Sequence, residues 1–576
     1  MKKLAKTILL TGIIGLTSGW AFAQTQQRGA VTDQEFVIRK DRVLTVPVQP
    51  RMYEKLPVLP KPTGLNEYSY LVTSYPLNLK PLDLKAEPSQ KVYSSERLEL
   101  YPGYVRVGYG NFASPLLEAR YMGTEIADFN YSLQLNHQSF GKGPVLAEES
   151  KESHTNLGFD GSYFTDFFEV FGGIKWDQDS YQFYGLDPKF ATDENGEFAG
   201  FDGNVFQAIE VKAGIRELEK VGPFSYEGQL SFRNFTDSYL AKENQLGAEA
   251  SLTFRPTQDW AGKVGLSYFS TKPEDMTYSL DRTYFGIRPT ISYKYEAFNF
   301  TAGVNLVSEN DSLENKSSDF HVFPVLKASY QFAEEFGFFG EFSGDVQRHT
   351  YYSFVNENPY LGPSEQLLNT VQNYKIEGGI EGQFQGAFSY RAAANVSRYN
   401  QMHFFVNKYT NNLVTTDSAR FSLVYDDKTT VYNINAELGY KLSDVFSLNS
   451  RLDLYQYDLS TQAEAWNRPI WELSVNNQVT PLERLIVQAN LNLMGGIKAR
   501  GHDLNDILGY TGPYPGPYEV VKLKTIAELQ LKADYGITDR ISIFAEGNNL
   551  LNGKNMRWLN YPVRGIQFIG GASFKF

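Results

Sequence analysis

The stretch Arg564-Gly-Ile-Gln-Phe-Ile-Gly-Gly-Ala-Ser-Phe-Lys-Phe576 alternates apolar and polar side chains up to the last residue of the sequence. Successive side chains of a β-strand point to opposite faces, so the pattern predicts a strand with one apolar and one mostly polar face. The predicted apolar face carries Ile566, Phe568, Gly570, Ala572, Phe574 and Phe576. No later segment could cover this face, and we therefore expect lipid to cover it, as in a transmembrane β-barrel.

The same alternation recurs along the chain from about residue 101 onward. The clearest example spans residues 431–458, where a break at Ser443-Asp444 separates two alternating runs and predicts a hairpin. Further alternating runs cover residues 336–343, 485–493 and 522–535. A soluble β-sandwich would also alternate, but its strands are rarely this long and regular. The pattern favours strands that cross a bilayer.

Short turns and longer gaps alternate between the predicted strands. The short turns fall near residues 125, 165, 220, 257, 296, 333, 385, 443, 481 and 538, and the longer gaps include 181–202, 350–366 and 498–518. Short periplasmic turns and longer outer loops are typical of outer-membrane barrels. Ten short turns with a first strand near 104–111 and a last one at 564–576 predict an all-β fold, a transmembrane antiparallel barrel of about 22 strands within a range of 18–22.

The segment before the barrel has two parts. Residues 1–23 resemble a secretory signal peptide, with basic residues at the start, a short apolar stretch and the cleavage-site pattern Ala21-Phe-Ala23, although an uncleaved membrane anchor is the alternative. Residues 24–100 contain closely spaced prolines, which predict a short extended segment lying in the periplasm or in the lumen. The predicted barrel then spans residues 101–576.

Composition narrows the class further. The chain has no cysteine, which excludes disulfides and thiol chemistry, and its formal net charge of −12 argues against nucleic acid as a partner. Aromatic residues make up 15% of the chain, and transmembrane barrels concentrate such rings at the two membrane interfaces. We therefore expect the protein in the outer membrane, with lipid as its main partner.

The region from residue 544 to 576 carries two recognisable elements. They are Glu546-Gly-Asn-Asn-Leu-Leu-Asn-Gly-Lys554 and Trp558-Leu-Asn-Tyr-Pro-Val-Arg564, followed by the final strand. This ending resembles the C-terminus of TonB-dependent receptors, in which Gly usually stands at the position of Val563. The resemblance implies an outer-membrane barrel of about 22 strands that takes part in nutrient transport. It also implies that Phe574 and Phe576 form the signal read by the barrel-assembly machinery during insertion.

The resemblance does not extend to the start of the chain. Fewer than about 80 residues separate Gln24 from the first predicted strand, and they lack the pattern of that family's N-terminal plug. Glu35-Phe-Val-Ile38 is either a docking strand or an ordinary extended segment. An open lumen of this width would leak solutes, so we expect it to be blocked by residues 24–100, by infolded loops, or by a periplasmic or lipoprotein partner.

Catalytic and metal-binding motifs are not found in the sequence. The six histidines are scattered, and there is neither a nucleophile elbow nor a phosphate-binding loop. Asp193-Glu-Asn-Gly196, with Asp187 and Asp202 nearby, is either a calcium loop or a solvated acidic loop, and it lacks EF-hand spacing. The sequence therefore predicts no catalytic, cofactor-binding or metal-ligating residues, no cofactor, and a protein that is not an enzyme. The alternative is a barrel hydrolase that assembles Ser and His from adjacent strands.

Two predicted loops are rich in tyrosine and proline. Their candidate contact residues are Tyr351, Tyr352, Tyr360, Tyr510, Tyr514 and Tyr518. Such side chains either contact ligands or partners at a low cost in conformational entropy, or cap the barrel mouth. Two functions follow as hypotheses. The barrel transports a nutrient across the outer membrane, or it is a plugless structural subunit of an outer-membrane assembly or secretion complex whose partners close the lumen.

Overall fold

The computed structural model describes eight segments of the chain. They are residues 101–126, 128–185, 195–218, 222–311, 319–408, 419–443, 445–501 and 518–576, and everything below concerns these residues. The predicted signal peptide, the proline-rich segment 24–100, Tyr510 and Tyr514 lie outside them.

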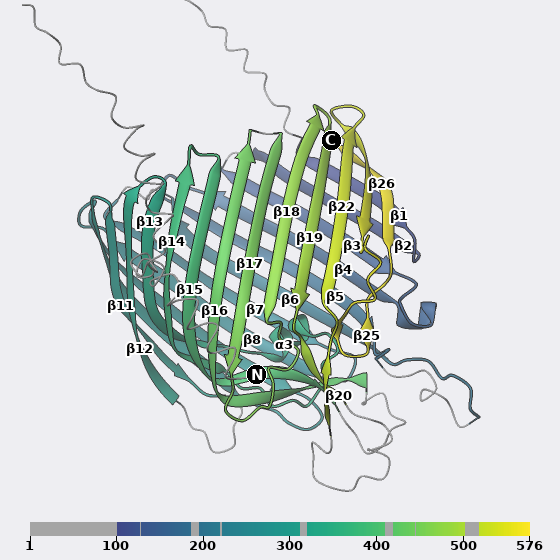
Figure 1. Cartoon of the computed structure of the whole chain (residues 1–576). Coiled ribbons are helices and arrows are strands. Elements are labelled where there is room, and N and C mark those ends of the chain that lie inside the picture. The colour runs from purple at the N-terminus through teal and green to yellow at the C-terminus, as the bar shows by residue number, and fades with distance from the viewer. Residues whose placement is uncertain are drawn as a thin grey trace, which may run out of the picture. The chain divides into compact units, whose positions relative to one another are not determined.

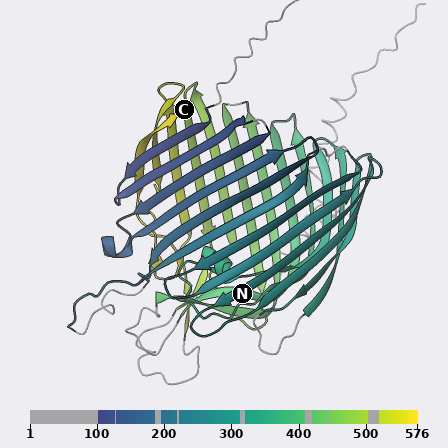
Figure 2. The same cartoon turned by 180° about the vertical axis from the view of Figure 1, so that it is seen from behind.

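The strands form one antiparallel sheet of 22 members that closes on itself (Figures 1 and 2). Its members are β1 Gly103–Gly110, β2 Ser114–Ile126, β3 Phe129–Phe140, β4 Glu152–Phe164, β5 Phe168–Gln182, β6 Gly203–Glu217, β7 Phe224–Thr236, β8 Lys242–Phe254, β9 Trp260–Glu274, β10 Arg282–Tyr295, β11 Phe298–Glu309, β12 Asp319–Ala333, β13 Phe336–Gln347, β14 Thr370–Phe384, β15 Phe388–Asn407, β16 Phe421–Leu442, β17 Phe446–Asp458, β18 Trp471–Leu482, β19 Leu485–Gly495, β22 Ile526–Gly536, β23 Ile541–Asn548 and β26 Gln567–Lys575. The predicted fold class and the strand number of 22 are confirmed.

Four short strands and two helices lie outside this sheet. They are β20 Lys498–Gly501 paired with β21 Glu519–Lys522, β24 Met556–Trp558 paired with β25 Tyr561–Pro562, the 3₁₀ helix η2 Ala147–Ser150 and the α-helix α3 Tyr351–Glu357. None of the helices among the described residues is long and apolar enough to span a membrane.

The first and last strands of the barrel seal it. β26 pairs with β1 over its length, with Phe574 opposite Val105. The Gly103 N–H donates to the Phe576 carbonyl oxygen at 3.0 Å, and the Phe576 N–H donates back to the Gly103 carbonyl oxygen at 2.9 Å. Because of this pairing the sheet has no unpaired edge, which is the condition for placing strands in lipid.

The outer surface of the barrel is apolar across neighbouring strands. One continuous row runs across five strands, each member directly opposite the next, and consists of Phe159, Ile174, Val211, Phe232 and Leu246. All five side chains are exposed. An exposed apolar surface of this extent requires a non-aqueous surrounding, so lipid covers it and the protein resides in the outer membrane.

The inner surface carries charged and polar side chains at the alternate positions. The Lys212 ammonium lies 3.0 Å from the Asp160 carboxylate across the wall, and the Arg233 guanidinium donates to the Gln245 side chain at 3.0 Å. Strand side chains alternate between the two faces, so a single layer of strands separates lipid from the lumen. The predicted two-faced strands are therefore present.

The ten predicted short turns join strands at the end of the barrel where β1 begins and β26 ends. In three of them a threonine side chain accepts from the backbone N–H three residues later. Phe168 donates to Thr165 Oγ1 at 2.9 Å, Trp260 to Thr257 Oγ1 at 3.2 Å and Ile541 to Thr538 Oγ1 at 3.0 Å. Such side-chain bonds stabilise tight turns, which accounts for the recurrence of threonine at these positions.

Phe574 and Phe576 lie on the outer surface at this same end. Both are exposed, their ring centroids are 6.1 Å apart, and the Phe576 ring stacks at 6.3 Å on Tyr121 of β2. Their role as an insertion signal stays a prediction.

Leu230 and Gln229 provide a matched test of the two faces. Leu230 is 61% exposed on the outside of β7, whereas Gln229 lines the lumen. We expect Leu230→Arg to lower the free energy of unfolding by about 2–4 kcal/mol because it places a charge in lipid. Gln229→Arg should change it little. Urea unfolding of the two variants in lipid vesicles measures both values, and equal destabilisation would contradict the assignment of faces.

Candidate functional site at the barrel mouth

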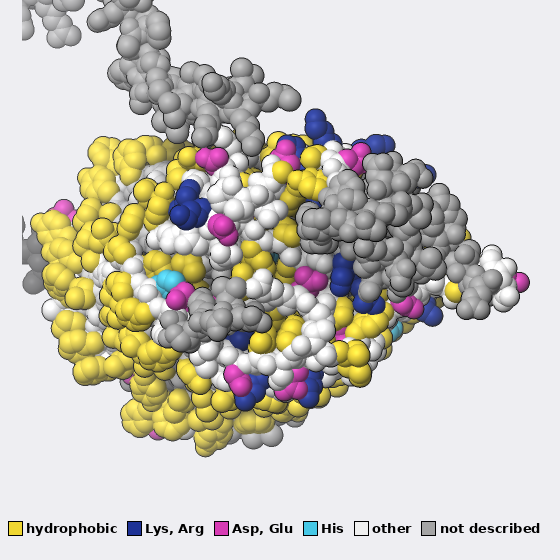
Figure 3. All heavy atoms as spheres, turned by 90° about the horizontal axis from the view of Figure 1, so that it is seen from below, with side chains coloured by type: hydrophobic (Ala, Val, Ile, Leu, Met, Phe, Trp, Pro, Cys, Tyr) yellow, Lys and Arg dark blue, Asp and Glu magenta, His cyan; other side chains and the backbone are white. Residues whose placement is uncertain are grey.

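The connection between β13 and β14, residues 348–369, folds into the mouth of the barrel. It contains α3, which begins after Thr350, where Ser353 N–H donates to Thr350 Oγ1 at 3.1 Å and Thr350 N–H donates to Ser353 Oγ at 2.8 Å. This reciprocal cap stabilises a helix start. Figure 3 looks onto this end, where polar and charged side chains lie inside a rim of hydrophobic ones. We call residues 348–369 the mouth loop.

The mouth loop is packed into a hydrophobic cluster at the end of the barrel. The cluster comprises Phe183, Tyr184, Phe201, Phe206, Ala208, Phe235, Ala241, Tyr351, Phe354, Val355, Tyr360, Leu361, Leu367, Phe405, Ala419, Phe421, Trp558 and Tyr561, all buried. Burial of this many apolar side chains holds the loop inside the barrel. Infolded loops, one of the three predicted blockers of the lumen, therefore lie across the mouth.

A stack of tyrosines joins three loops within this cluster. The rings of Tyr360 and Tyr561 stack with centroids 3.6 Å apart, and Tyr184 lies 4.9 Å from Tyr561. The Tyr561 hydroxyl donates to the Ala419 carbonyl oxygen at 2.5 Å, and the hydroxyls of Tyr184 and Tyr360 are 3.3 Å apart. The connection between β23 and β26 is thus fixed against the mouth loop.

Arg282 of β10 holds the two ends of the mouth loop together. Its guanidinium donates to the His349 carbonyl oxygen at 2.7 Å and to Asn369 Oδ1 at 2.9 Å. The Asn369 amide in turn donates to Glu309 Oε2 at 2.8 Å. Charged groups buried in this way need such partners, so the network fixes where the loop leaves and rejoins the barrel wall.

The start of α3 is tied to the neighbouring wall. The Tyr351 N–H donates to Glu243 Oε2 at 2.8 Å, and the Tyr351 hydroxyl donates to Asp237 Oδ2 at 2.9 Å. The Arg233 guanidinium lies 4.1 Å from the ring centroid of Tyr352, a cation–π contact. These contacts anchor the helix to β7, β8 and their connection.

The end of α3 is held by Glu357. Its carboxylate lies 2.9 Å from His403 Nε2 and 2.9 Å from the Arg468 guanidinium. Burial opposes ionisation of this group, but the contacts with His403 and Arg468 outweigh it and lower the pKa of Glu357 to about 2. Burial and the neighbouring His403 lower the pKa of His349 to about 3, so His349 is neutral where it stacks on Phe354 at 5.1 Å. The ionised Glu357 thus latches the helix to β15.

The second half of the mouth loop runs beside the start of β16. The Phe421 N–H donates to the Tyr360 carbonyl oxygen at 2.8 Å, and the Gly362 N–H donates to the Phe421 carbonyl oxygen at 2.9 Å. Glu365 accepts from the Leu423 N–H at 2.8 Å. Burial nevertheless raises the pKa of the Glu365 carboxyl to about 7. This acid is therefore poised to change charge near neutral pH.

The predicted contact tyrosines fall in two places. Tyr351 and Tyr360 are buried in the cluster at 2% and 7% exposure, and Tyr352 is half-buried beside them. Tyr518 is exposed, with its ring edge-on to Trp466 at 5.8 Å. The structure thus brings the first three together in the mouth and leaves Tyr518 on the surface. A role of these tyrosines in ligand contact stays a prediction.

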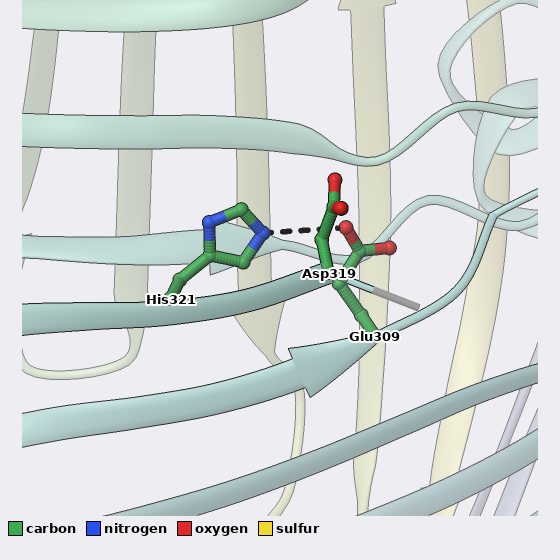
Figure 4. A group of neighbouring side chains, drawn as sticks. All are labelled: Glu309, Asp319 and His321. Carbon is green, nitrogen blue, oxygen red and sulfur yellow. Dashed lines mark hydrogen bonds and ion pairs between the residues drawn. The ribbon is translucent and has the colours of Figure 1, made fainter. Parts of the chain in front are cut away.

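Glu309, Asp319 and His321 form a cluster that sequence reasoning missed (Figure 4). The pairing of β11 with β12 places Glu309 opposite Asp319, and His321 Nε2 lies 3.4 Å from Glu309 Oε1. Each residue offers one ligand atom, and these atoms lie within 4.8 Å of one another, which suits a divalent cation. The sequence signal for this cluster is a glutamate at the end of one strand followed by an Asp-x-His at the start of the next. Asp187 and Asp193 of the predicted acidic loop lie outside the described residues.

Two polar niches lie in the lumen wall. Their volumes are about 650 and 790 Å³. The first is lined by Glu227, Glu249, Lys263, Arg288, Lys327, Glu341 and Asp345, and the second by Glu381, Arg391, Glu437 and Arg451. Charges of both signs line the lumen, so its wall can solvate polar and charged solutes.

The Glu357 latch can be tested because the chain contains no cysteine. Val355 is 4% exposed in α3, whereas Met276 is 82% exposed in the connection between β9 and β10. We expect Glu357→Gln to speed maleimide labelling of a Val355→Cys variant about tenfold or more, because it removes charge-assisted bonds that hold the helix. Labelling at Met276→Cys should be the same with and without Glu357→Gln. Unchanged labelling at both sites would show that Glu357 does not hold the helix.

Glu365 predicts a pH dependence of the same labelling. Its pKa is raised from 4.5 to about 7, so it stabilises the closed loop fully below pH 4.5, and this contribution is lost as the pH rises to 7. The ratio of the Val355→Cys labelling rates with Glu365 and with Glu365→Gln should therefore rise between pH 4.5 and 7, by at most about three hundredfold, and then level. The ratio cancels the titration of His349 and of the introduced cysteine thiol, which both variants share. A constant ratio would place Glu365 in contact with water.

Comparison with known proteins agrees with this architecture. The sequence matches no protein-family model and no curated protein. Among solved structures, FpvA of Pseudomonas aeruginosa, in complex with a heterologous pyoverdine and iron, superposes with a TM-score of 0.61 at 12% identity, covering 83% of this chain and 72% of that chain. The FrpB iron transporter of Neisseria meningitidis gives 0.62 at 11% identity, with 83% and 81% covered. The copper transporter OprC gives 0.58 at 11% identity, with 82% of each chain covered.

At sequence identities this low, the similarity supports a shared fold and no more. The feature that supports the similarity is the closed 22-stranded barrel. Its last strand, β26, follows the two C-terminal elements identified in the sequence and pairs with the first strand, β1. The protein is an outer-membrane β-barrel with the 22-stranded fold of the TonB-dependent receptors.

Proposed function

We propose that this barrel transports a nutrient across the outer membrane through its lumen, with the mouth loop as the outer gate. The observation that carries the proposal is a wide lumen with a charged wall, whose mouth is covered by packed loops among which the mouth loop contributes the helix α3. A barrel of 22 strands encloses more space than its own side chains can fill. The resemblance in fold to FpvA, FrpB and OprC supports transport as the general function.

The way in which the mouth loop is held suits a gate. Its contacts with the wall are made by side chains such as Arg282, Glu357 and Tyr351, and by the few backbone bonds near Phe421. None of these contacts belongs to the strand ladder that closes the barrel. The loop can therefore move out of the mouth while every backbone bond within the membrane stays paired.

A disulfide across the gate tests the proposal. Leu361 and Phe421 form a parallel β-bridge between the mouth loop and β16. The chain has no cysteine of its own, so two introduced cysteines can pair only with each other. In a strain lacking the gene, we expect the Leu361→Cys/Phe421→Cys variant to restore uptake of the affected nutrient only under reducing conditions. The matched control, Phe388→Cys/Tyr440→Cys, joins β15 to β16 at the short-turn end and should transport under both conditions.

Two outcomes would contradict the proposal. If oxidation leaves uptake through the Leu361→Cys/Phe421→Cys variant unchanged, the mouth loop is not the gate. If deletion affects no nutrient, and the protein purified in mild detergent carries stoichiometric lipoprotein or periplasmic partners, the barrel is a structural subunit of an outer-membrane complex.

A further inference from the structure

A cavity of about 400 Å³ lies between the barrel wall and the loops of the mouth. One side is the lumen face of β19 and β22, with Asn492 and Glu528. The other side is the connection between β23 and β26, with Arg557, Trp558 and Tyr561, together with Tyr360 of the mouth loop. Its volume falls within the range of small-molecule sites.

Two opposite charges in this cavity have no ion-pair partner among the described residues. Glu528 is half-buried and makes no hydrogen bond or ion pair there. Arg557 donates from one guanidinium nitrogen to the Asn467 carbonyl oxygen at 2.8 Å, and no described carboxylate lies within 4.0 Å of it. Burial lowers the pKa of the Arg557 guanidinium and the cation Arg468 lowers it further, while the more distant carboxylates of Glu472 and Glu357 oppose the shift only in part. Partly buried charges without an ion-pair contact are costly, so both groups favour a ligand that supplies one.

The cavity is also lined by a second pair of opposite charges, Glu152 and Arg564, which differ from Glu528 and Arg557 because they contact each other. Glu152 of β4 and Arg564 form an ion pair with each other, and the Arg564 guanidinium also lies 3.8 Å from the ring centroid of Phe140. These two charges are satisfied within the protein and have no need of a ligand. Among the charged residues that line the cavity, Glu528 of β22 and Arg557 of the connection between β23 and β26 are therefore the two without an ion-pair partner in the described part of the chain.

The rest of the lining suits a ligand with both apolar and amide groups. Trp558 and the stacked pair Tyr360 and Tyr561 present aromatic surface. The side chains of Asn548 and Gln567 offer amide donors and acceptors from β23 and β26. Aromatic surface binds apolar side chains, and amides pair with peptide groups.

We propose that this cavity binds a zwitterionic ligand, an amino acid or short peptide, with its ammonium group at Glu528 and its carboxylate at Arg557. The proposal rests on the transport function and names its class of substrate. A zwitterion neutralises both charges at once. A neutral sugar leaves both unmatched, an anion is repelled by Glu528, and a cation is repelled by Arg557.

Calorimetry on the purified full-length protein tests this directly. The probes are the tripeptide Ala-Phe-Ala with free termini, its N-acetylated and C-amidated forms, and maltotriose. We expect the free peptide to bind, acetylation or amidation each to weaken binding about tenfold or more, and maltotriose not to bind. Glu528→Gln should abolish the effect of acetylation alone, and Arg557→Gln should abolish the effect of amidation alone.

Two control variants keep the charge count matched. Glu437→Gln changes a lumen carboxylate outside this cavity, and Lys554→Gln changes an exposed cation in the same connection as Arg557. Both should bind the four probes as the unchanged protein does. Every titration is repeated in the Glu357→Gln variant, whose loosened mouth loop removes access as a limit.

The outcomes separate this proposal from the transport function. Equal binding of free and blocked peptides, tighter binding of maltotriose, or no peptide binding with either the intact or the loosened mouth loop would overturn the ligand assignment. Gated uptake of a nutrient that is not zwitterionic would do the same while leaving the transport function intact. Binding that depends on both termini, without any effect of the disulfide lock on uptake, would retain the site and reject the gate.

Discussion

Closure of the sheet is the constraint on which the rest of the structure depends. Lipid offers no hydrogen-bond partners, so every backbone group of a membrane strand must pair with a neighbouring strand. The seam between β1 and β26 meets this need by bringing the two ends of the barrel into full register. The seam is close-packed, since a Cβ at Gly571 would overlap the Val107 carbonyl oxygen. Glycine is required there to let the backbones approach.

A closed barrel of this size has no core of its own, and the mouth loop supplies one. The cluster around Phe354, Tyr360 and Phe421 is the largest assembly of buried apolar side chains that the described residues form. It is held by packing and by ion pairs such as Glu357 with Arg468, rather than by the strand ladder. The molecule therefore combines a barrel wall stabilised by backbone pairing with a mouth loop held by side-chain contacts, and the stability of the loop depends on charge and on pH.

Some charged residues of the lumen form ion pairs with each other, and others have no ion-pair partner among the described residues. Pairs such as Lys212 with Asp160 satisfy each other along the wall, and Glu152 with Arg564 does so beside the mouth. Glu528 and Arg557 face one cavity without such a partner. On our proposal this difference sets the specificity, because a bound solute is recognised by the charges that the protein itself leaves unpaired.

The sequence by itself determined the fold class, the strand number and the position of the turns. Alternation along residues 564–576 and the threonines at 165 and 538 report local backbone geometry, which needs no knowledge of distant residues. Only the tertiary structure decided that Tyr351 and Tyr360 are buried, and that Glu357 meets His403. The mouth loop lies between β13 and β14, yet Tyr351 meets Asp237 and Glu243, just before and within β8. Contacts between strands so far apart in the sequence depend on how many strands close the barrel and in which register, which a local pattern does not encode.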